Sequence, residues 1–162
     1  MKKHFKSLFC LALSICLMAS SLLTFAPASA AEATTVSEET TDLDNGDYCV
    51  VTLEETTIPS MARYATKKKA AKKTYKYYNA NDVLCWSYTL NATFMYDGTL
   101  VVCSDVSHTI DVYNYKSWIY DSGKRWKEAN SAYGKATFHL IGSSANKTVK
   151  LKITCTKHGV IS

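Results

Sequence analysis

The chain has 162 residues, a formal net charge of +5, six cysteines and four histidines. That length accommodates one modest hydrophobic core, which excludes a multidomain enzyme. The sequence has no C-x-x-C motif and no histidine-rich cluster. This argues against a zinc site, and we expect no cofactor.

Residues 1–30 are predicted to be a secretory signal peptide. Three lysines lie among the first six residues, residues 8–25 form an apolar run, and residues 28–30 read Ala-Ser-Ala, a typical cleavage site. The run nearly reaches the ~20 residues that span a bilayer, so a retained anchor is the alternative. Pro27 and the small-residue ending favour cleavage before Ala31. We therefore expect a secreted, extracellular or envelope-associated protein with no transmembrane segment after cleavage.

The next segment, 31–57, is acidic and contains no lysine or arginine. Residues 31–47 also lack aromatic side chains, so this part can bury little apolar surface and is expected to be a disordered leader. Only 48–53, YCVVTL, has the composition of a short strand. The folded domain is therefore expected at 58–162. The acids of the leader are Glu32, Glu38, Glu39, Asp42, Asp44, Asp47, Glu54 and Glu55.

Everything after residue 74 has the pattern of β-structure. In 84–96 the even positions are apolar or aromatic and the odd positions mainly polar, which indicates a strand with one buried face. Asp97-Gly98 then predicts a turn. Six or seven short strands without a helical period indicate an all-β, antiparallel, immunoglobulin-like sandwich. Further strands are predicted at 99–112, 115–120, 125–132, 136–142 and 147–157, with Gly123, Gly134 and Gly142 between them.

The last predicted strand has two unlike faces. Leu151 and Ile153 alternate with Lys150 and Lys152, so the period of two places the apolar residues on one side and the lysines on the other. Cys155 continues the apolar side.

The hairpin around residues 97 and 98 decides whether Cys85 and Cys103 can bond. A two-residue turn and a three-residue loop with a left-handed glycine both fit, and the loop collects more apolar residues on one face. The loop places Cys85 opposite Thr109 and Cys103 opposite Asn91. In either register the cysteines lie about 20 Å apart along the ladder, whereas a disulfide needs α-carbons within about 7 Å. These two cysteines therefore cannot bond to each other.

Four cysteines remain after signal cleavage, and an even number in an exported protein predicts disulfides. Of the two remaining connectivities, we predict Cys103–Cys155, which would tie the hairpin to the last strand, and Cys49–Cys85, which would fasten the N-terminal segment. The preferred register places Cys103 on the polar face, in conflict with the apolar stripe before Cys155. A bulge near Ser104-Asp105, or a bond at the rim of the sheet, would resolve the conflict. Each bond would contribute about 2–4 kcal/mol.

Several segments resemble a family of small secreted proteins of Gram-positive, gut-type bacteria. They are KTYKYYN, LCWSY with TFMYDGT, the region of Trp118 and Trp126, SAYGKATFHL and the terminal VKLKITCTKHGVIS. The similarity covers about 61–162 and omits the acidic leader. Cys103 and Cys155 fall where members of that family often carry cysteines. The resemblance implies a secreted β-sandwich without a catalytic site.

The sequence carries no convincing catalytic arrangement. Ser107 and His108 are neighbours on a predicted strand, so their side chains point to opposite faces. No Gly-x-Ser-x-Gly elbow is present to expose a nucleophile. A glycosidase would need two of the few acids outside the leader on either side of a cleft. We therefore expect a protein that is not an enzyme and has no metal site.

A basic stretch at 62–79, ARYATKKKAAKKTYKYYN, interleaves bases with tyrosines. It could bind anionic polymers such as teichoic acids, acidic lipids or nucleic acid. One alternative is a charged strand edge that resists aggregation. Another is that the acidic leader folds back over the stretch and competes with a partner. The candidate residues are Arg63, Lys67, Lys68, Lys69, Lys72, Lys73 and Lys76.

Aromatic residues are dense at 113–126, YNYKSWIYDSGKRW. Exposed aromatic rings stack on sugars and on protein partners, whereas ordinary core packing is the alternative. The candidate surface residues are Tyr115, Trp118, Tyr120 and Trp126.

Charge and aromatic content together predict a secreted, non-catalytic binding protein at or outside the cell envelope. From Tyr48 onward the chain has 16 bases and 8 acids. The expected partner is a polyanion or glycan such as an anionic cell-wall polymer, and no nucleic acid is expected. The alternative is a secreted cationic effector that acts on competitor or host membranes.

Overall fold

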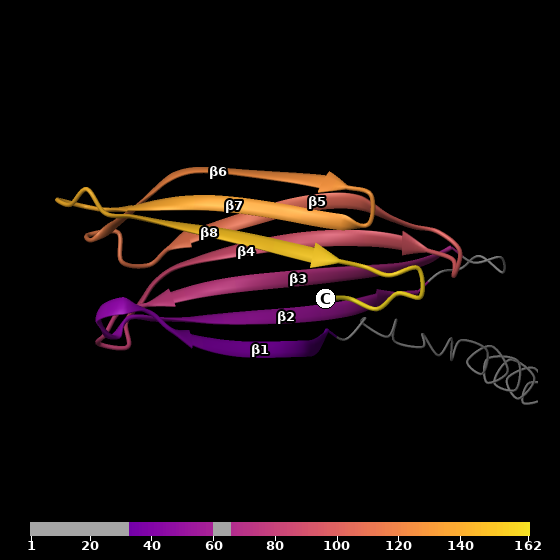
Figure 1. The fold of residues 1–162 in the computed structure, drawn as a ribbon, viewed down its shortest axis with the longest axis horizontal. Coiled ribbons are helices and arrows are strands. Elements are labelled where there is room, and N and C mark those ends of the chain that lie inside the picture. The colour runs from indigo at the N-terminus through magenta and orange to yellow at the C-terminus, as the bar shows by residue number, and fades with distance from the viewer. Residues whose placement is uncertain (1–32, 60–65) are drawn as a thin grey trace, which may run out of the picture. The chain divides into compact units, whose positions relative to one another are not determined.

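The computed structural model describes residues 33–59 and 66–162, which belong to one compact unit at 31–162. The predicted signal peptide at 1–30 and the candidate Arg63 lie outside the described residues. The described chain is almost entirely β-structure, arranged as two antiparallel sheets (Figure 1). Within this part of the chain, no helix is long and apolar enough to cross a membrane.

The two sheets differ in size. The five-stranded sheet, called sheet A, has the order β1-β2-β3-β4-β5, and the three-stranded sheet, called sheet B, has the order β6-β7-β8. The strands of sheet A are β1 (Thr34–Asp42), β2 (Tyr48–Ile58), β3 (Lys67–Tyr78), β4 (Leu84–Tyr96) and β5 (Val101–Val112). The strands of sheet B are β6 (Trp118–Glu128), β7 (Ser131–Leu140) and β8 (Asn146–Thr154).

The predicted all-β antiparallel sandwich is confirmed, although the strands number eight rather than six or seven. In each sheet every strand pairs with its neighbour in sequence. Immunoglobulin domains instead distribute consecutive strands between two sheets by Greek-key connections. The sandwich is therefore a stack of two meanders, and each meander is held by short local turns.

The expected disordered leader at 31–57 is wrong for most of its length. β1 and β2 pair with each other across a short 3-10 turn (η2, Asp44–Gly46), and β2 pairs with β3 along its whole length. The domain therefore starts well before residue 58, and the short strand expected at 48–53 extends to Ile58. Leu53 and Cys49 bury apolar surface against the sheet, which the acidic composition concealed. β1 itself is exposed along all nine residues and is ordered by backbone pairing.

Two glycines that were expected to separate strands lie inside strands. Gly123 is within β6 and Gly134 within β7. A Cβ at Gly123 would lie 2.7 Å from the Tyr120 hydroxyl, and one at Gly134 would overlap the Tyr88 hydroxyl. Both positions therefore need glycine because another chain segment approaches closely, not because the chain turns there. The chain turns instead between β6 and β7 at residues 129 and 130.

Neither expected register of the β4–β5 hairpin is observed. Tyr96 pairs with Val101, so the loop comprises residues 97–100. The Asp97 carboxylate accepts hydrogen bonds of 2.8 Å from the backbone amides of Thr99 and Leu100, which stabilises this longer loop. The glycine of the loop has the expected left-handed conformation, with φ of 91°.

A bulge brings Cys103 to the buried face, as the sequence suggested. The pairing shifts between Thr93, which is opposite Asp105, and Phe94, which is opposite Cys103. Ser104 is the extra residue, and its hydroxyl donates a 3.0 Å hydrogen bond to the Thr93 carbonyl. Cys103 is consequently only 2% exposed.

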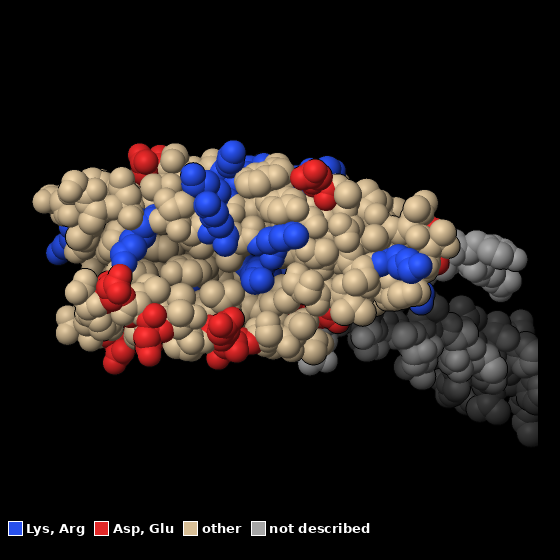
Figure 2. Space-filling view, in the orientation of Figure 1, with Lys and Arg blue, Asp and Glu red and all other residues tan. Residues whose placement is uncertain are grey.

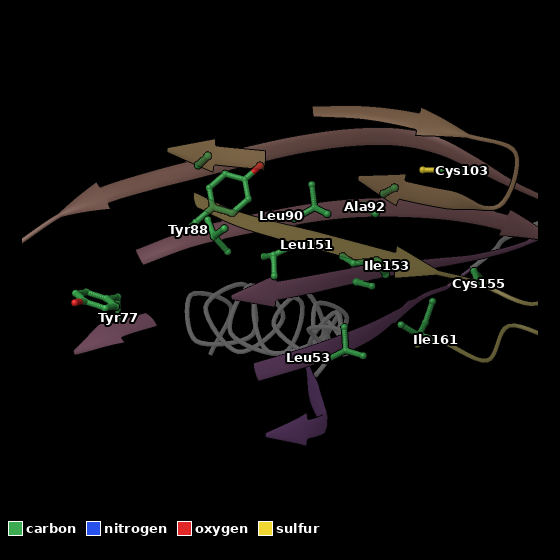
Figure 3. Close-up of a cluster of buried hydrophobic side chains, with 14 of the residues drawn as sticks. Leu53, Tyr77, Tyr88, Leu90, Ala92, Cys103, Leu151, Ile153, Cys155 and Ile161 are labelled. Carbon is green, nitrogen blue, oxygen red and sulfur yellow. The ribbon is translucent and has the colours of Figure 1, made fainter. Parts of the chain in front are cut away.

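The core lies between the sheets and is built around Trp86. Its indole ring stacks on Phe138 from sheet B at a centroid distance of 3.9 Å and on Tyr77 from β3 at 5.0 Å. Figure 3 shows aliphatic side chains of both sheets facing one another in the same core, among them Leu90 and Leu151. The burial pattern of β4 confirms the predicted alternation from Tyr88 to Tyr96, whereas Cys85 and Ser87, on the other face, are buried as well.

The four cysteines of the described chain are buried free thiols, so neither predicted disulfide is present. The Cys49–Cys85 pairing is incompatible with the register because β3 separates their strands. Two strand spacings of about 4.8 Å exceed the reach of a disulfide. Cys103 and Cys155, in contrast, flank the β6–β7 turn. Their backbone amides donate to the carbonyls of adjacent residues, Ala129 and Asn130.

Candidate functional site

The outer face of sheet B carries a cluster of lysines and aromatic rings. Two cross-strand rows build it: Lys124, Lys135 and Lys150 are directly opposed in one row, and Trp126, Tyr133 and Lys152 in the next. We call these six residues the basic-aromatic patch. Together with the backbone of Gly134 and Leu151 they line a shallow hollow of about 460 Å³.

Strand alternation explains why these side chains point outward together. In β8 the residues Val149, Leu151 and Ile153 are buried, so Lys150 and Lys152 face solvent, as the sequence predicted. In β7, Gly134 allows the Tyr88 hydroxyl of sheet A to approach closely from the inside. Its neighbours along the strand, Tyr133 and Lys135, therefore extend to the outer side.

The two aromatic rings of the patch contact each other and two lysines. Trp126 and Tyr133 stack with a centroid distance of 5.2 Å and an interplanar angle of 8°. The Lys124 ammonium lies 5.0 Å from the Trp126 ring centroid, and the Lys152 ammonium lies 5.5 Å from that of Tyr133. Cation–π attraction thus orders two flexible lysines. The ring faces are engaged within the patch itself.

The charge of the patch is uncompensated. None of the residues that line its hollow is acidic, and no ion pair of the described chain involves its four lysines. Glu128 follows on β6 one row beyond Trp126. Figure 2 shows basic side chains gathered over the middle of one face of the molecule, with most acidic ones toward β1, β2 and their turn and others along the opposite edge.

The basic side chains that alternate with the patch on β6 serve a structural purpose. Arg125 Nε donates to the Val106 carbonyl over 3.3 Å, and Lys127 Nζ donates to the Ser104 carbonyl. They cover carbonyl groups of the edge strand β5, which would otherwise be open to pairing with another chain.

The basic stretch predicted to bind polyanions lies on β3, an interior strand of sheet A. Lys69 and Lys72 form 3.0 Å ion pairs with Glu55 and Glu54 of β2. The stretch is therefore neither a free basic segment nor a charged edge, and the neighbouring acidic strand neutralises part of it. Lys73 donates to a backbone carbonyl of β8 over 3.3 Å. The structure places Lys67, Lys68 and Lys76 on the same strand.

The four aromatic candidates separate in the structure. Trp118 is only 5% exposed and packs edge-on against Trp86 in the core. Tyr120 is half-buried against Phe138. Tyr115 is 71% exposed in the β5–β6 connection. Trp126 alone belongs to the patch, and its partner Tyr133 was not singled out from the sequence.

The residues considered for catalysis form no catalytic group. The His108 imidazole Nδ1 lies 3.1 Å from the Tyr88 hydroxyl on the core side, while Ser107 points to the opposite face. Burial raises the pKa of Tyr88 to about 12, so the phenol stays protonated at neutral pH. Burial, followed by the neighbouring Arg125, lowers the pKa of His108. Within 33–59 and 66–162, no three histidine, cysteine or acidic side chains gather as metal ligands.

Comparison of the chain with protein-family models, with curated proteins and with solved structures found no match.

Proposed function

We propose that this protein is a secreted, non-catalytic binding protein that holds an anionic polymer at or outside the cell envelope. The observation that carries the proposal is the basic-aromatic patch, in which four lysines converge on one sheet face without an acidic partner. Adjacent strands lie about 4.8 Å apart, so the cross-strand lysines form a regular positive array. Such an array raises the local concentration of a polyanion and binds it in a salt-dependent way.

The ring geometry supports an anionic ligand over a neutral glycan for this patch. Neutral sugars stack on open aromatic faces, whereas Trp126 and Tyr133 stack on each other and carry lysines. The aromatic pair thus positions positive charge and leaves little ring surface for a sugar. Anionic groups such as phosphates or carboxylates would contact the ammonium groups directly.

Co-sedimentation with purified Gram-positive cell walls, at low and at physiological salt, tests this function. The test variant is K124Q/K135Q/K150Q/K152Q. The matched control, K67Q/K68Q/K72Q/K76Q, removes the same charge from β3. We expect the sedimented fraction of the wild-type protein and of the control to decrease as the salt concentration rises. The test variant should lose most binding at every salt concentration.

Two results would contradict the proposal. One is the absence of wild-type sedimentation at low salt; the other is an equal loss in the test and control variants, which would indicate net charge rather than the patch. Leakage assays on vesicles of anionic lipid address the membrane-effector alternative. Patch-dependent leakage would favour that alternative over wall binding.

A further inference from the structure

Four turns converge at one end of the sandwich, on the left in Figure 1. They connect β1 to β2, β3 to β4, β5 to β6, and β7 to β8. We call this region, residues 43–47, 79–85, 113–118 and 140–147, the loop end. It encloses a hollow of about 400 Å³. The lining residues used below are Asn45, Asp47, Asn114, Ser117, Trp118 and Lys147.

Hydrogen bonds hold the turns of the loop end in fixed relation. The Asp47 carboxylate accepts from the Tyr77 hydroxyl and, over 3.1 Å, from the backbone amide of Ala80, which joins the first two turns. The Asn114 backbone amide donates to the Cys85 carbonyl over 3.0 Å, and Ile141 donates to Ser117 over 2.8 Å. A preformed hollow of this kind does not need to be ordered when a ligand binds.

Two polar side chains around the hollow have no hydrogen-bond partner among the described residues. These are the Asn45 amide and the Ser117 hydroxyl. The Lys147 ammonium, also at the hollow, lies 5.6 Å from the Tyr77 ring centroid. Burial raises the pKa of the neighbouring Cys85 thiol, and hydrogen bonds from the Asn79 backbone and then from the side chains of Asn114 and Trp118 lower it. The hollow thus combines donors and acceptors with an aromatic wall.

Open aromatic rings stand next to the hollow. Tyr113 and Tyr115 are 53% and 71% exposed and line a second depression of about 350 Å³. Asn114 lines both depressions, so the tyrosines and the polar hollow are contiguous. Neither tyrosine stacks on another ring of the described chain, in contrast to Trp126 and Tyr133.

We propose that the loop end binds a saccharide residue, with Tyr113 or Tyr115 against the sugar ring and Asn45, Asn114 and Ser117 hydrogen-bonded to its hydroxyl groups. Sugar rings present an apolar face and a rim of hydroxyls, which match an open aromatic ring next to amides and a hydroxyl. This site is separate from the basic-aromatic patch. It gives the protein a second mode of recognition, through sugar hydroxyl groups and an open aromatic ring.

Nuclear magnetic resonance titration of the isotope-labelled 31–162 protein tests this site. The probes are N-acetylglucosamine, galactose, glucuronic acid and sialic acid, each added separately. At least one sugar should shift the Trp118 indole signal and the amides of 113–117 saturably, while the Trp126 indole signal stays unchanged. N114A and Y115A should each weaken binding by roughly tenfold, about 1.4 kcal/mol.

Matched controls separate the site from general effects of substitution. N91A removes an amide from the outer face of sheet A, and L100A removes a side chain as exposed as Tyr115 at the other end of the sandwich. Both controls should bind as the wild type does. The proposal is overturned if no sugar of the panel gives a saturable shift. It is equally overturned if N114A and Y115A, with native amide spectra, bind as tightly as the controls.

Discussion

The lysines of β3 and those of sheet B differ in how far nearby acidic residues neutralise their charge. On β3 they are consecutive in sequence but lie between two strands, and the acidic strand β2 pairs with Lys69 and Lys72. On sheet B they come from three strands and are separated in sequence, yet the register brings them into adjacent rows without an acid. The density of charge along a chain is therefore a poor measure of the charge that a partner meets.

The difference follows from the geometry of β-sheets. Along a strand, neighbouring side chains alternate between faces, so a run such as KKK divides between the two sides of sheet A. Across strands, directly opposed side chains share a face and lie about 5 Å apart. Four lysines on three strands therefore produce a stronger local field than four lysines on one strand. We therefore propose sheet B, rather than β3, as the polyanion-binding face.

The largest effect on stability is expected from truncating Trp86, which packs against both β3 and sheet B. Trp86 is 1% exposed and joins β3 to sheet B through its stacks with Tyr77 and Phe138. Trp86→Ala should lower the free energy of unfolding by about 3–5 kcal/mol, measured by urea denaturation. A loss below about 1 kcal/mol would mean that the sheets do not pack through this ring. Met95→Ala, which truncates an exposed side chain of the same strand, is the control.

Removing the acidic partner of one β3 lysine should make β3 more similar to sheet B in its affinity for anionic surfaces. Glu54→Gln takes away the partner of Lys72, whose side chain is 47% exposed. Binding to anionic vesicles at low salt should strengthen by roughly fivefold, because a lysine at an anionic surface contributes about 1 kcal/mol. Surface ion pairs are weak, so the free energy of unfolding should change by less than about 1 kcal/mol. Unchanged vesicle binding would show that Glu54 does not mask Lys72.

The smallest effect on stability is expected at the junction of the two sheets. There the His108 Nε2 atom lies 3.5 Å from the Arg125 Nη1 atom. Burial and then Arg125 lower the pKa of His108 from its ordinary value of 6.5. The unfolded chain therefore binds a proton first, and the stabilisation present above pH 6.5 is lost as the pH falls below it. His108→Gln should flatten this dependence in denaturation curves. Equal slopes for wild type and His108→Gln would contradict the shift.

The sequence predicted the fold best where alternation was strong. The apolar face of 84–96, the two unlike faces of the last strand and the bulge near Ser104 were all read correctly. The acidic strands were missed because composition alone does not reveal backbone pairing or the lysines opposite Glu54 and Glu55. Gly123 and Gly134 were read as turn residues because their true role depends on close approaches that composition does not reveal: the Tyr120 hydroxyl and the Lys135 carbonyl at Gly123, and the Tyr88 hydroxyl of sheet A at Gly134.

The candidate site was only partly predictable. Lys150, Lys152 and Trp126 were visible as outward or surface residues, but nothing in the sequence linked them to each other. That link is the register of β6, β7 and β8, which places Tyr133 and Lys135 between them. The loop end could not be predicted from the sequence either, because it is built from four turns that are far apart in the chain.

The salt dependence of binding to linear polyphosphate distinguishes the basic-aromatic patch from the β3 lysines. The logarithm of the binding constant is measured against the logarithm of salt concentration for the wild type, the patch variant and the β3 control. The account predicts that losing four phosphate-contacting lysines lowers the slope by roughly 3 for the patch variant. The control should keep nearly the wild-type slope. An unchanged slope in the patch variant, or an equal decrease in the control, would contradict the claim that the sheet B patch is the polyanion site.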